Sequence, residues 1–185
     1  MPGRWLAPGR YLTSVLQIEV EWLRSRGFKA LLLDIDNTLV SRDTQEVSPV
    51  VIDWVNELTN QGFKLYLVTN NWHRVVFETA ALLSLPVVHR SMKPLPFNYL
   101  RALSRLKVKR RNALVVGDQL MTDILGAKLS GIESVLVLPL TDTDLMHTKI
   151  LRKVEKVLLG DRRPEPPAEF DPLKPEYGVL PEGGS

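Results

Sequence analysis

The chain alternates between short continuous apolar runs and longer stretches in which apolar residues recur at every third or fourth position. The continuous runs predict buried strands at residues 30–33, 64–68, 86–88, 113–116 and 134–138. The helical spacing predicts helices over about residues 48–61, 72–84, 95–106, 122–130 and 144–159. Because strand and helix alternate, we expect an α/β fold, a doubly wound parallel sheet with helices on both faces.

The two ends of the chain depart from this pattern. Residues 1–27 carry aromatic and aliphatic side chains at partly helical spacing that ends at Gly27. We expect an N-terminal helical extension there, which either packs on the sheet or presents an apolar surface to something else. Residues 161–185 hold six of the 13 prolines, which predicts a tail that is mostly disordered or draped over the surface. Residues 28–160 are expected to form the main domain.

Composition narrows the class of protein. The chain has 185 residues, of which 44% are apolar and 24% charged, as in an ordinary globular domain. It has no cysteine, which excludes disulfides, thiolate metal sites and a cysteine nucleophile and fits a reducing compartment. No apolar run approaches the roughly 20 residues of a membrane span, and the first residues lack the apolar core of a signal peptide. We therefore expect a cytoplasmic location, either free or peripheral at a membrane.

Charge is spread unevenly along the chain. The net charge is +3, but residues 161–185 hold six acids and three bases, so the rest of the chain is more basic. A basic body favours an anionic partner such as phosphate, nucleic acid or a membrane surface. The cluster at 107–111 is either a solvated connection or a contact with such a surface. No nucleic-acid-binding module is recognisable, so we expect no nucleic-acid partner.

Two carboxylates directly follow the leucine run at 31–33. Asp34 and Asp36 lie two positions apart, so on an extended chain their side chains point to the same side. The carboxyl end of a strand in a doubly wound sheet faces the ligand crevice. Two carboxylates there are costly unless a cation lies between them or one is protonated. The alternative is an aspartate that caps the turn at Asn37-Thr38, beside a second, solvated aspartate.

Further polar groups fall at strand ends or helix starts. Thr69 and Asn70 follow one strand, Lys93 precedes a proline, and Asp118 follows another strand with Asp123 five residues later. Each has an ordinary explanation alone, as turn chemistry, a solvated lysine or a helix cap. In this order, and all at such positions, they outline a single phosphate-transfer site.

The residue types suit that chemistry. A carboxylate can attack phosphorus and form an aspartyl-phosphate, and a second acid can protonate the leaving oxygen. Mg2+ takes carboxylate, carbonyl and phosphate oxygens as ligands, and would offset the repulsion between two anionic reactants. Thr69 and the amides after it can bind phosphate oxygens, and Lys93 adds compensating positive charge.

The ordered set resembles the four motifs of the haloacid dehalogenase (HAD) superfamily of aspartate-nucleophile phosphatases, over about residues 28 to 140. Its motifs correspond to residues 34–38, Thr69, Lys93 and residues 117–123. The Asn-Thr pair after the aspartates points to phosphatases rather than dehalogenases. The details look most like the YqeG-type group of subfamily IIIA, which is similar to the phosphatidylglycerophosphate phosphatases of organelles.

The resemblance implies a role for each motif position, with Asp34 as nucleophile and Asp36 as general acid and base. The catalytic residues it implies are Asp34, Asp36, Thr69 and Lys93. The phosphate-binding residues it implies are Thr69, Asn70 and Lys93. The Mg2+ ligands it implies are Asp34, the main-chain carbonyl of Asp36, and Asp118, with Asp123 supporting the metal. The implied fold is the HAD-like Rossmannoid three-layer sandwich.

Motif spacing bears on the substrate. Only 32 residues separate Asp36 from Thr69, and 23 separate Thr69 from Lys93, whereas a separate cap domain needs roughly 50. We therefore expect no cap domain and an open site, which by family resemblance suits large substrates. The expected function is a Mg2+-dependent phosphomonoesterase that acts through an aspartyl-phosphate on a phospholipid head group such as phosphatidylglycerophosphate, in peripheral contact with an anionic membrane. The alternatives are a soluble sugar-phosphate or nucleotide phosphatase and a non-catalytic phosphate-binding module.

Overall fold

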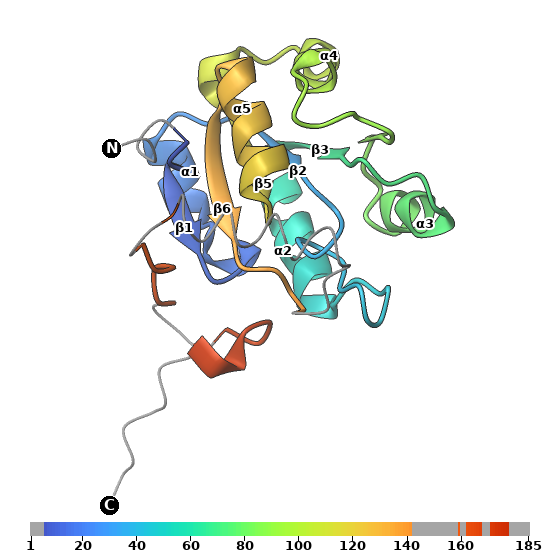
Figure 1. The fold of residues 1–185 in the computed structure, drawn as a ribbon, viewed down its shortest axis with the longest axis vertical. Helices are drawn as coiled ribbons and strands as arrows, with labels where there is room; N and C mark the ends of the chain where they lie inside the picture. The colour runs from blue at the N-terminus through green and yellow to red at the C-terminus, as the bar shows by residue number, and fades with distance from the viewer. Residues whose placement is uncertain (1–5, 142–158, 160–161, 168–170, 178–185) are drawn as a thin grey trace, which may run out of the picture.

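The computed structural model describes residues 6–141, 159, 162–167 and 171–177, and six parallel strands of this part form one sheet with helices on both sides (Figure 1). The strands are β1 (Arg10–Leu12), β2 (Ala30–Leu33), β3 (Lys64–Val68), β4 (Val87–Val88), β5 (Ala113–Gly117) and β6 (Glu133–Val137). The helices are α1 (Val20–Ser25), α2 (Pro49–Asn60), α3 (Arg74–Leu82), α4 (Phe97–Leu106) and α5 (Leu125–Ser130). Short 3-10 turns lie at Val15–Gln17, Arg110–Asn112 and Pro175–Tyr177, and a single π-helical turn at Leu120–Ile124. The predicted α/β fold is confirmed.

Strand order places β2 at the centre of the sheet. The order is β1-β6-β5-β2-β3-β4, so the chain runs from β2 outward through β3 to β4, and later returns to the other side through β5 and β6. Leu31 of β2 lies opposite Leu65 of β3 and Leu114 of β5. The direction of winding reverses between β2 and β5, and ligands bind at such a switch point, outside the carboxyl ends of the strands.

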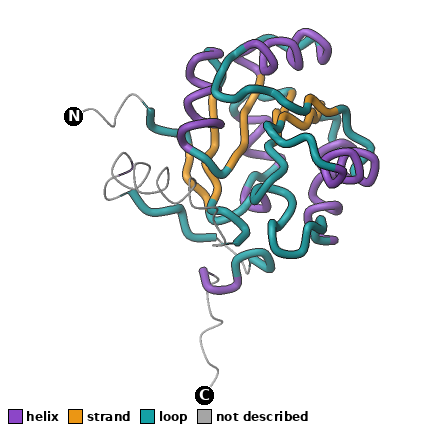
Figure 2. Tube along the Cα trace, turned by 45° about the vertical axis from the view of Figure 1, so that its right-hand side comes forward, coloured by secondary structure: helices purple, strands orange, loops and turns teal. Residues whose placement is uncertain are grey.

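Both faces of the sheet are covered, which explains why the strands read as continuous apolar runs. Leu31 and Leu33 belong to a large core cluster with residues of α1, α2 and α3, whereas Leu32 packs with residues of α4 and α5. Figure 2 shows the strands between helices on both sides. Residues 37–92 contain no domain of their own beyond α2, β3, α3 and β4, in agreement with the predicted absence of a cap.

Some helices start at other residues than their apolar pattern indicates. The helix expected from residue 72 begins at Arg74, because the side chain of Asn71 accepts a hydrogen bond from the backbone N–H of His73 and holds a turn there. The helix expected from residue 122 lies within a helical segment that begins with the π-helical turn at Leu120 and continues as α5. The predicted helix over 144–159 lies almost entirely outside the described residues.

The expectation of a helical extension over residues 1–27 is wrong for Arg10–Leu12, which form β1 and pair in parallel with β6. Three residues are too few to show the alternating pattern of a strand in the sequence. They are extended because they pair with the edge of β6. Leu12 and Leu23 are fully buried, and the Trp22 ring lies 5.5 Å from that of Phe28. The described part of this segment therefore packs on the sheet, and we propose that it belongs to the same domain.

Within the described residues, no helix has the length and apolar character to cross a bilayer.

The described parts of the C-terminal tail contact β1 and its surroundings. The backbone of Glu165 forms an isolated parallel β-bridge with Leu12, and its side chain forms an ion pair of 2.5 Å with Arg10. Thr13 Oγ1 donates a hydrogen bond of 3.2 Å to buried Asp171, and Leu173 packs against the main core cluster. These contacts join the end of the described chain to the strand that completes the sheet.

Candidate active site

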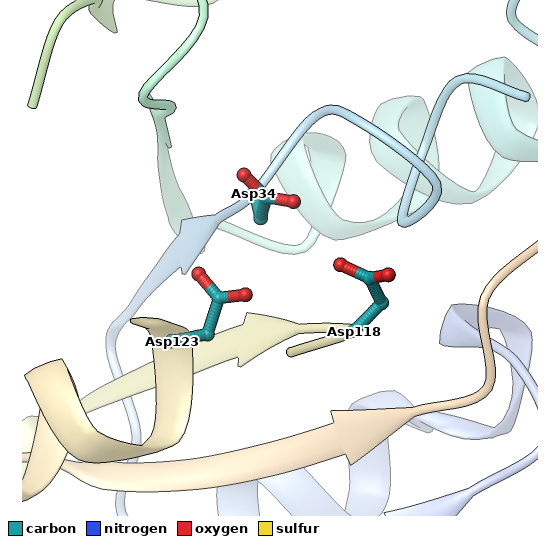
Figure 3. A group of neighbouring side chains, drawn as sticks. All are labelled: Asp34, Asp118 and Asp123. Carbon is teal, nitrogen blue, oxygen red and sulfur yellow. The ribbon is translucent and has the colours of Figure 1, made fainter. Parts of the chain in front are cut away.

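Three buried aspartates meet at the carboxyl ends of β2 and β5. Asp34 directly follows β2, where its backbone N–H donates to the carbonyl of Val116, and only 6% of its surface is exposed. Asp118 directly follows β5, and Asp123 lies in the π-helical turn. Figure 3 shows the three side chains grouped together, with the carboxylates of Asp118 and Asp123 on the side of Asp34. One oxygen from each lies within 4.8 Å of the others.

Gly117 makes room for this arrangement. The carboxylate of Asp123 lies over its Cα, so that a Cβ on residue 117 would be 2.3 Å from Asp123 Cγ. No other residue type fits there without moving Asp123. The same carboxylate accepts a hydrogen bond of 3.2 Å from the backbone N–H of Gln119, which fixes the turn around it. Local backbone therefore holds Asp123 in the site.

Lys93 provides the positive charge among these carboxylates. Its Nζ lies 2.5 Å from Asp34 Oδ1 and 2.7 Å from Asp123 Oδ1, and the residue is buried. The side chain of Asn70 holds the backbone of Lys93 at both of its polar groups. Asn70 Oδ1 accepts from Lys93 N–H at 2.7 Å, and Asn70 Nδ2 donates to the Lys93 carbonyl at 3.1 Å.

Asp36 lies beside this cluster, half-buried, and both of its carboxylate oxygens accept hydrogen bonds. Thr69 Oγ1 donates at 3.0 Å to one oxygen, and Asn71 Nδ2 donates at 2.8 Å to the other. Asn71 N–H in turn donates to Thr69 Oγ1 at 3.0 Å. The turn after β3 thus orients the second aspartate of the pair.

Burial and the neighbouring charges shift the pKa values of Asp34 and Lys93. Burial raises the pKa of Asp34 well above its usual value, Lys93 opposes that rise, and Asp123, Asp118 and Asp36 add to it. Burial alone would lower the pKa of Lys93, but Asp123 and Asp34 outweigh it, so the pKa lies well above its usual value. One ammonium group cannot neutralise three ionised carboxylates, which favours a bound cation.

The donor set fits a hard divalent cation. Asp34, Asp118 and Asp123 supply carboxylate oxygens, the ligands that Mg2+ prefers, and no cysteine exists in the chain to favour a softer metal. A divalent cation held there would supply Lewis-acid stabilisation of the negative charge on a phosphoryl group.

The structure brings the predicted site residues together around the ends of β2, β3 and β5. Sequence reasoning assigned no role to Asn71, although it follows the predicted Thr69-Asn70 pair, nor to buried Tyr99, whose hydroxyl donates to Asp123 Oδ1 at 3.5 Å. Burial and then Asp123 raise the pKa of Tyr99, which therefore stays a neutral donor. An aromatic residue at helical spacing gives no sign that its hydroxyl reaches a site.

Comparisons with known proteins show which family the sequence matches. A family model described as haloacid dehalogenase-like hydrolase matches residues 16–131. The "Probable phosphatase YqeG" of Bacillus subtilis (strain 168) is 32% identical over 160 residues, 86% of this chain and 93% of that protein.

Two solved structures share the fold. The HAD phosphatase from Thermococcus onnurineus aligns with a TM-score of 0.55 at 20% identity, over 74% of this chain and 100% of that one. The cobalt-bound deoxy-D-mannose-octulosonate 8-phosphate phosphatase from Haemophilus influenzae aligns with a TM-score of 0.51 at 9% identity, over 72% and 88% of the two chains.

The contacts of Lys93 predict a pH-dependent loss of stability in Lys93→Met. With chelator present and at neutral pH, we expect the free energy of unfolding to fall by about 3–5 kcal/mol, because buried carboxylates lose their counter-charge. Without Lys93, which opposes the rise, the pKa of Asp34 lies still higher in the folded state, so the cost appears as pH rises above the unfolded-state pKa of about 4. Urea unfolding at pH 5 and pH 7 should therefore show the smaller loss at pH 5.

The control is Lys174→Met, which removes another buried lysine whose charged partner, Glu176, is exposed. Its effect on unfolding should depend little on pH in this range. Equal losses at both pH values in Lys93→Met would contradict the assignment of Lys93 as the counter-charge of the cluster.

Proposed function

Because this chain belongs to the haloacid dehalogenase-like hydrolase family and is a phosphatase of that family, we propose that Asp34 is the nucleophile of a Mg2+-dependent phosphomonoesterase. The observation that carries the proposal is the buried cluster of Asp34, Asp118 and Asp123 around Lys93, at the switch point of the sheet. Asp36 beside the cluster supplies the second acid that a hydrolase needs and a simple binder does not, which favours an enzyme over a non-catalytic phosphate-binding module.

In the proposed first step, a carboxylate oxygen of Asp34 bonds to phosphorus while the bond from phosphorus to the ester oxygen breaks. Asp36 gives its proton to that leaving oxygen. In the second step, ionised Asp36 takes a proton from a water molecule, whose oxygen attacks the phosphorus. The bond between phosphorus and Asp34 breaks and phosphate leaves, which restores both carboxyl groups.

The neighbours of these two aspartates would position the reaction. Thr69 donates to Asp36 in the structure, and a phosphate oxygen that accepted this hydroxyl instead would release Asp36 to act on the leaving group. The ammonium group of Lys93 would contact the phosphoryl oxygens as their charge develops. Asn70 would position Lys93 through its two hydrogen bonds to the Lys93 backbone, in addition to its predicted part in phosphate binding.

For the metal, we propose that Asp34, Asp118 and the main-chain carbonyl of Asp36 bind Mg2+ and that Asp123 supports the site. The closeness of the three carboxylate oxygens supports this proposal. Asp34 would then be both a metal ligand and the nucleophile, whereas Asp118 would act only through the metal, so a change of charge at Asp118 tests metal binding on its own.

For the substrate, we propose a phosphorylated lipid head group such as phosphatidylglycerophosphate, met by a protein that is peripheral at a membrane. The support is the absence of a cap domain within residues 37–92, which leaves no separate lid to enclose a small substrate. A soluble sugar phosphate or nucleotide is the alternative. The test is phosphate release from vesicle-embedded phosphatidylglycerophosphate compared with soluble sugar phosphates and nucleotides. Hydrolysis of the soluble compounds alone would reject the lipid substrate.

The nucleophile assignment predicts that Asp34→Asn lowers kcat at least about a thousandfold, because the amide cannot attack phosphorus. Asp53→Asn, the same exchange on the exposed side of α2, is the matched control and should keep its activity. Burial raises the pKa of Asp34 above its unfolded value, so ionised Asp34 costs stability as pH rises above about 4. In chelator at pH 7, Asp34→Asn should therefore unfold no more easily than wild type. Near-normal turnover would exclude Asp34 as nucleophile.

The metal assignment predicts that Mg2+ raises the Tm of the wild-type protein, because a ligand that binds only the folded state stabilises it. Asp118→Asn should need at least about tenfold more Mg2+ for the same rise, since one charged ligand is lost. Asp53→Asn again serves as control. A Tm that is insensitive to Mg2+, together with full phosphatase activity in chelator, would overturn the metal assignment.

A further inference from the structure

Exposed apolar side chains are concentrated in one segment of the chain. Of eight large apolar residues that are strongly exposed in the described part of the chain, six lie between residues 72 and 97. Scattered single residues of this kind are ordinary, whereas a group marks an interaction surface. We name four of them the rim patch: Trp72, Met92, Leu95 and Phe97, the last of which is 65% exposed.

The rim patch borders the candidate active site. Trp72 follows Asn71, whose side chain contacts Asp36, and Met92 precedes Lys93, which contacts Asp34. The two segments that carry the patch are hydrogen-bonded together. Arg90 N–H donates to the carbonyl of Asn71 at 3.3 Å, and Ser91 N–H donates to that of Thr69 at 2.9 Å. A surface that bound the rim patch would therefore lie next to the residues proposed to act on phosphate.

The surroundings of the rim patch are basic. The side chain of Arg74 is 90% exposed, and the guanidinium of Arg90 lies 5.2 Å from the centre of the Trp72 ring. From residue 71 to residue 97 the chain holds three bases, Arg74, Arg90 and the buried Lys93, and a single acid, Glu78, which forms an ion pair of 2.6 Å with Arg74. Aromatic and aliphatic side chains flanked by arginines are typical of protein surfaces that insert at the head-group level of anionic bilayers.

We propose that the rim patch, with Arg74 and Arg90, is the docking surface of this protein for an anionic lipid bilayer. The apolar side chains enter the interface, the arginines contact anionic head groups, and the site around Asp34 faces the lipid phosphates. This inference rests on the proposed lipid-directed function of that site, which it deepens by naming the surface that meets the membrane.

Other parts of the chain and other occupants fit less well. Trp22 of the N-terminal segment packs against Phe28 and the core, so its ring is not available to a membrane. The basic cluster at 107–111 precedes β5, whereas Asp118 follows it, so that cluster lies at the opposite end of the sheet. A second copy docked face to face would set arginines against arginines, which is unfavourable for a symmetric interface.

Binding to vesicles is measured first, because it needs no turnover. Full-length protein is sedimented with phosphatidylcholine vesicles that either contain or lack phosphatidylglycerol, at low and at physiological salt. We expect binding to the anionic vesicles, weakened by salt. Phe97→Ser should weaken it about tenfold. The control Leu129→Ser, at an aliphatic residue on α5 that is 49% exposed, should leave it unchanged. Arg74→Gln with Arg90→Gln should weaken it about fivefold per arginine.

Fluorescence then locates the contact. Anionic vesicles should shift the tryptophan emission of the wild type to shorter wavelength, and Trp72→Phe should abolish the shift while it keeps most of the binding. No binding to anionic vesicles, equal losses in Phe97→Ser and Leu129→Ser, or an unchanged shift in Trp72→Phe would each overturn the docking surface. So would a self-association in solution that Phe97→Ser disrupts, since a second copy would then cover the patch.

Turnover separates this inference from the proposed function. Hydrolysis of soluble p-nitrophenyl phosphate with Mg2+ should be the same in wild type, Phe97→Ser and Leu129→Ser, while release from vesicle-embedded phosphatidylglycerophosphate should fall about tenfold only in Phe97→Ser. Normal hydrolysis of p-nitrophenyl phosphate by a protein that does not bind the vesicles would reject the docking surface alone. Vesicle binding through the rim patch, with no hydrolysis of any phosphomonoester, rejects the proposed catalysis and leaves the docking surface in place.

Discussion

The interaction on which the site depends is the contact of one buried lysine with two of three buried carboxylates. Lys93 lies within 2.7 Å of Asp34 and Asp123, and Asp118 completes the group. Buried charges of one sign are tolerated only when they are paired or bind a cation. The cluster therefore needs the lysine and favours a metal. The same excess of negative charge that costs the fold stability would give the site its proposed affinity for Mg2+ and, through the metal, for phosphate.

The surrounding structure serves to hold this group together. Asp34 and Asp118 lie at the ends of the neighbouring strands β2 and β5. Asp123 lies in the π-helical turn that packs over Gly117. The side chain of Asn70, in the turn after β3, holds the backbone of Lys93. The apolar faces of the sheet are buried by helices on both sides, so the strand ends are held rigidly. Catalytic groups on rigid elements keep their relative positions when substrate binds, which lowers the cost of reaching the transition state.

The region from α3 to the start of α4 has a different physical character from the core. It has one acid, two arginines and a group of exposed apolar side chains, and its loop before α4 is hydrogen-bonded to the site at Thr69 and Asn71. The residues proposed to bind substrate phosphate and those proposed to contact a membrane therefore belong to one continuous segment. A site of this kind can couple surface contact to substrate approach without a mobile cap domain.

The sequence alone determined the alternation of strands and helices, the family, and the set of polar residues at the strand ends, because local patterns of apolar residues and short motifs carry that information. It did not reveal β1, since Arg10–Leu12 become a strand only through the edge of β6. It also could not show that Asn71 and Tyr99 reach Asp36 and Asp123, or that Asn70 holds the Lys93 backbone. The rim patch likewise consists of residues whose exposure no local pattern indicates. These features depend on contacts between segments distant in sequence, and such contacts are decided only when the sheet order and the packing of the helices are fixed.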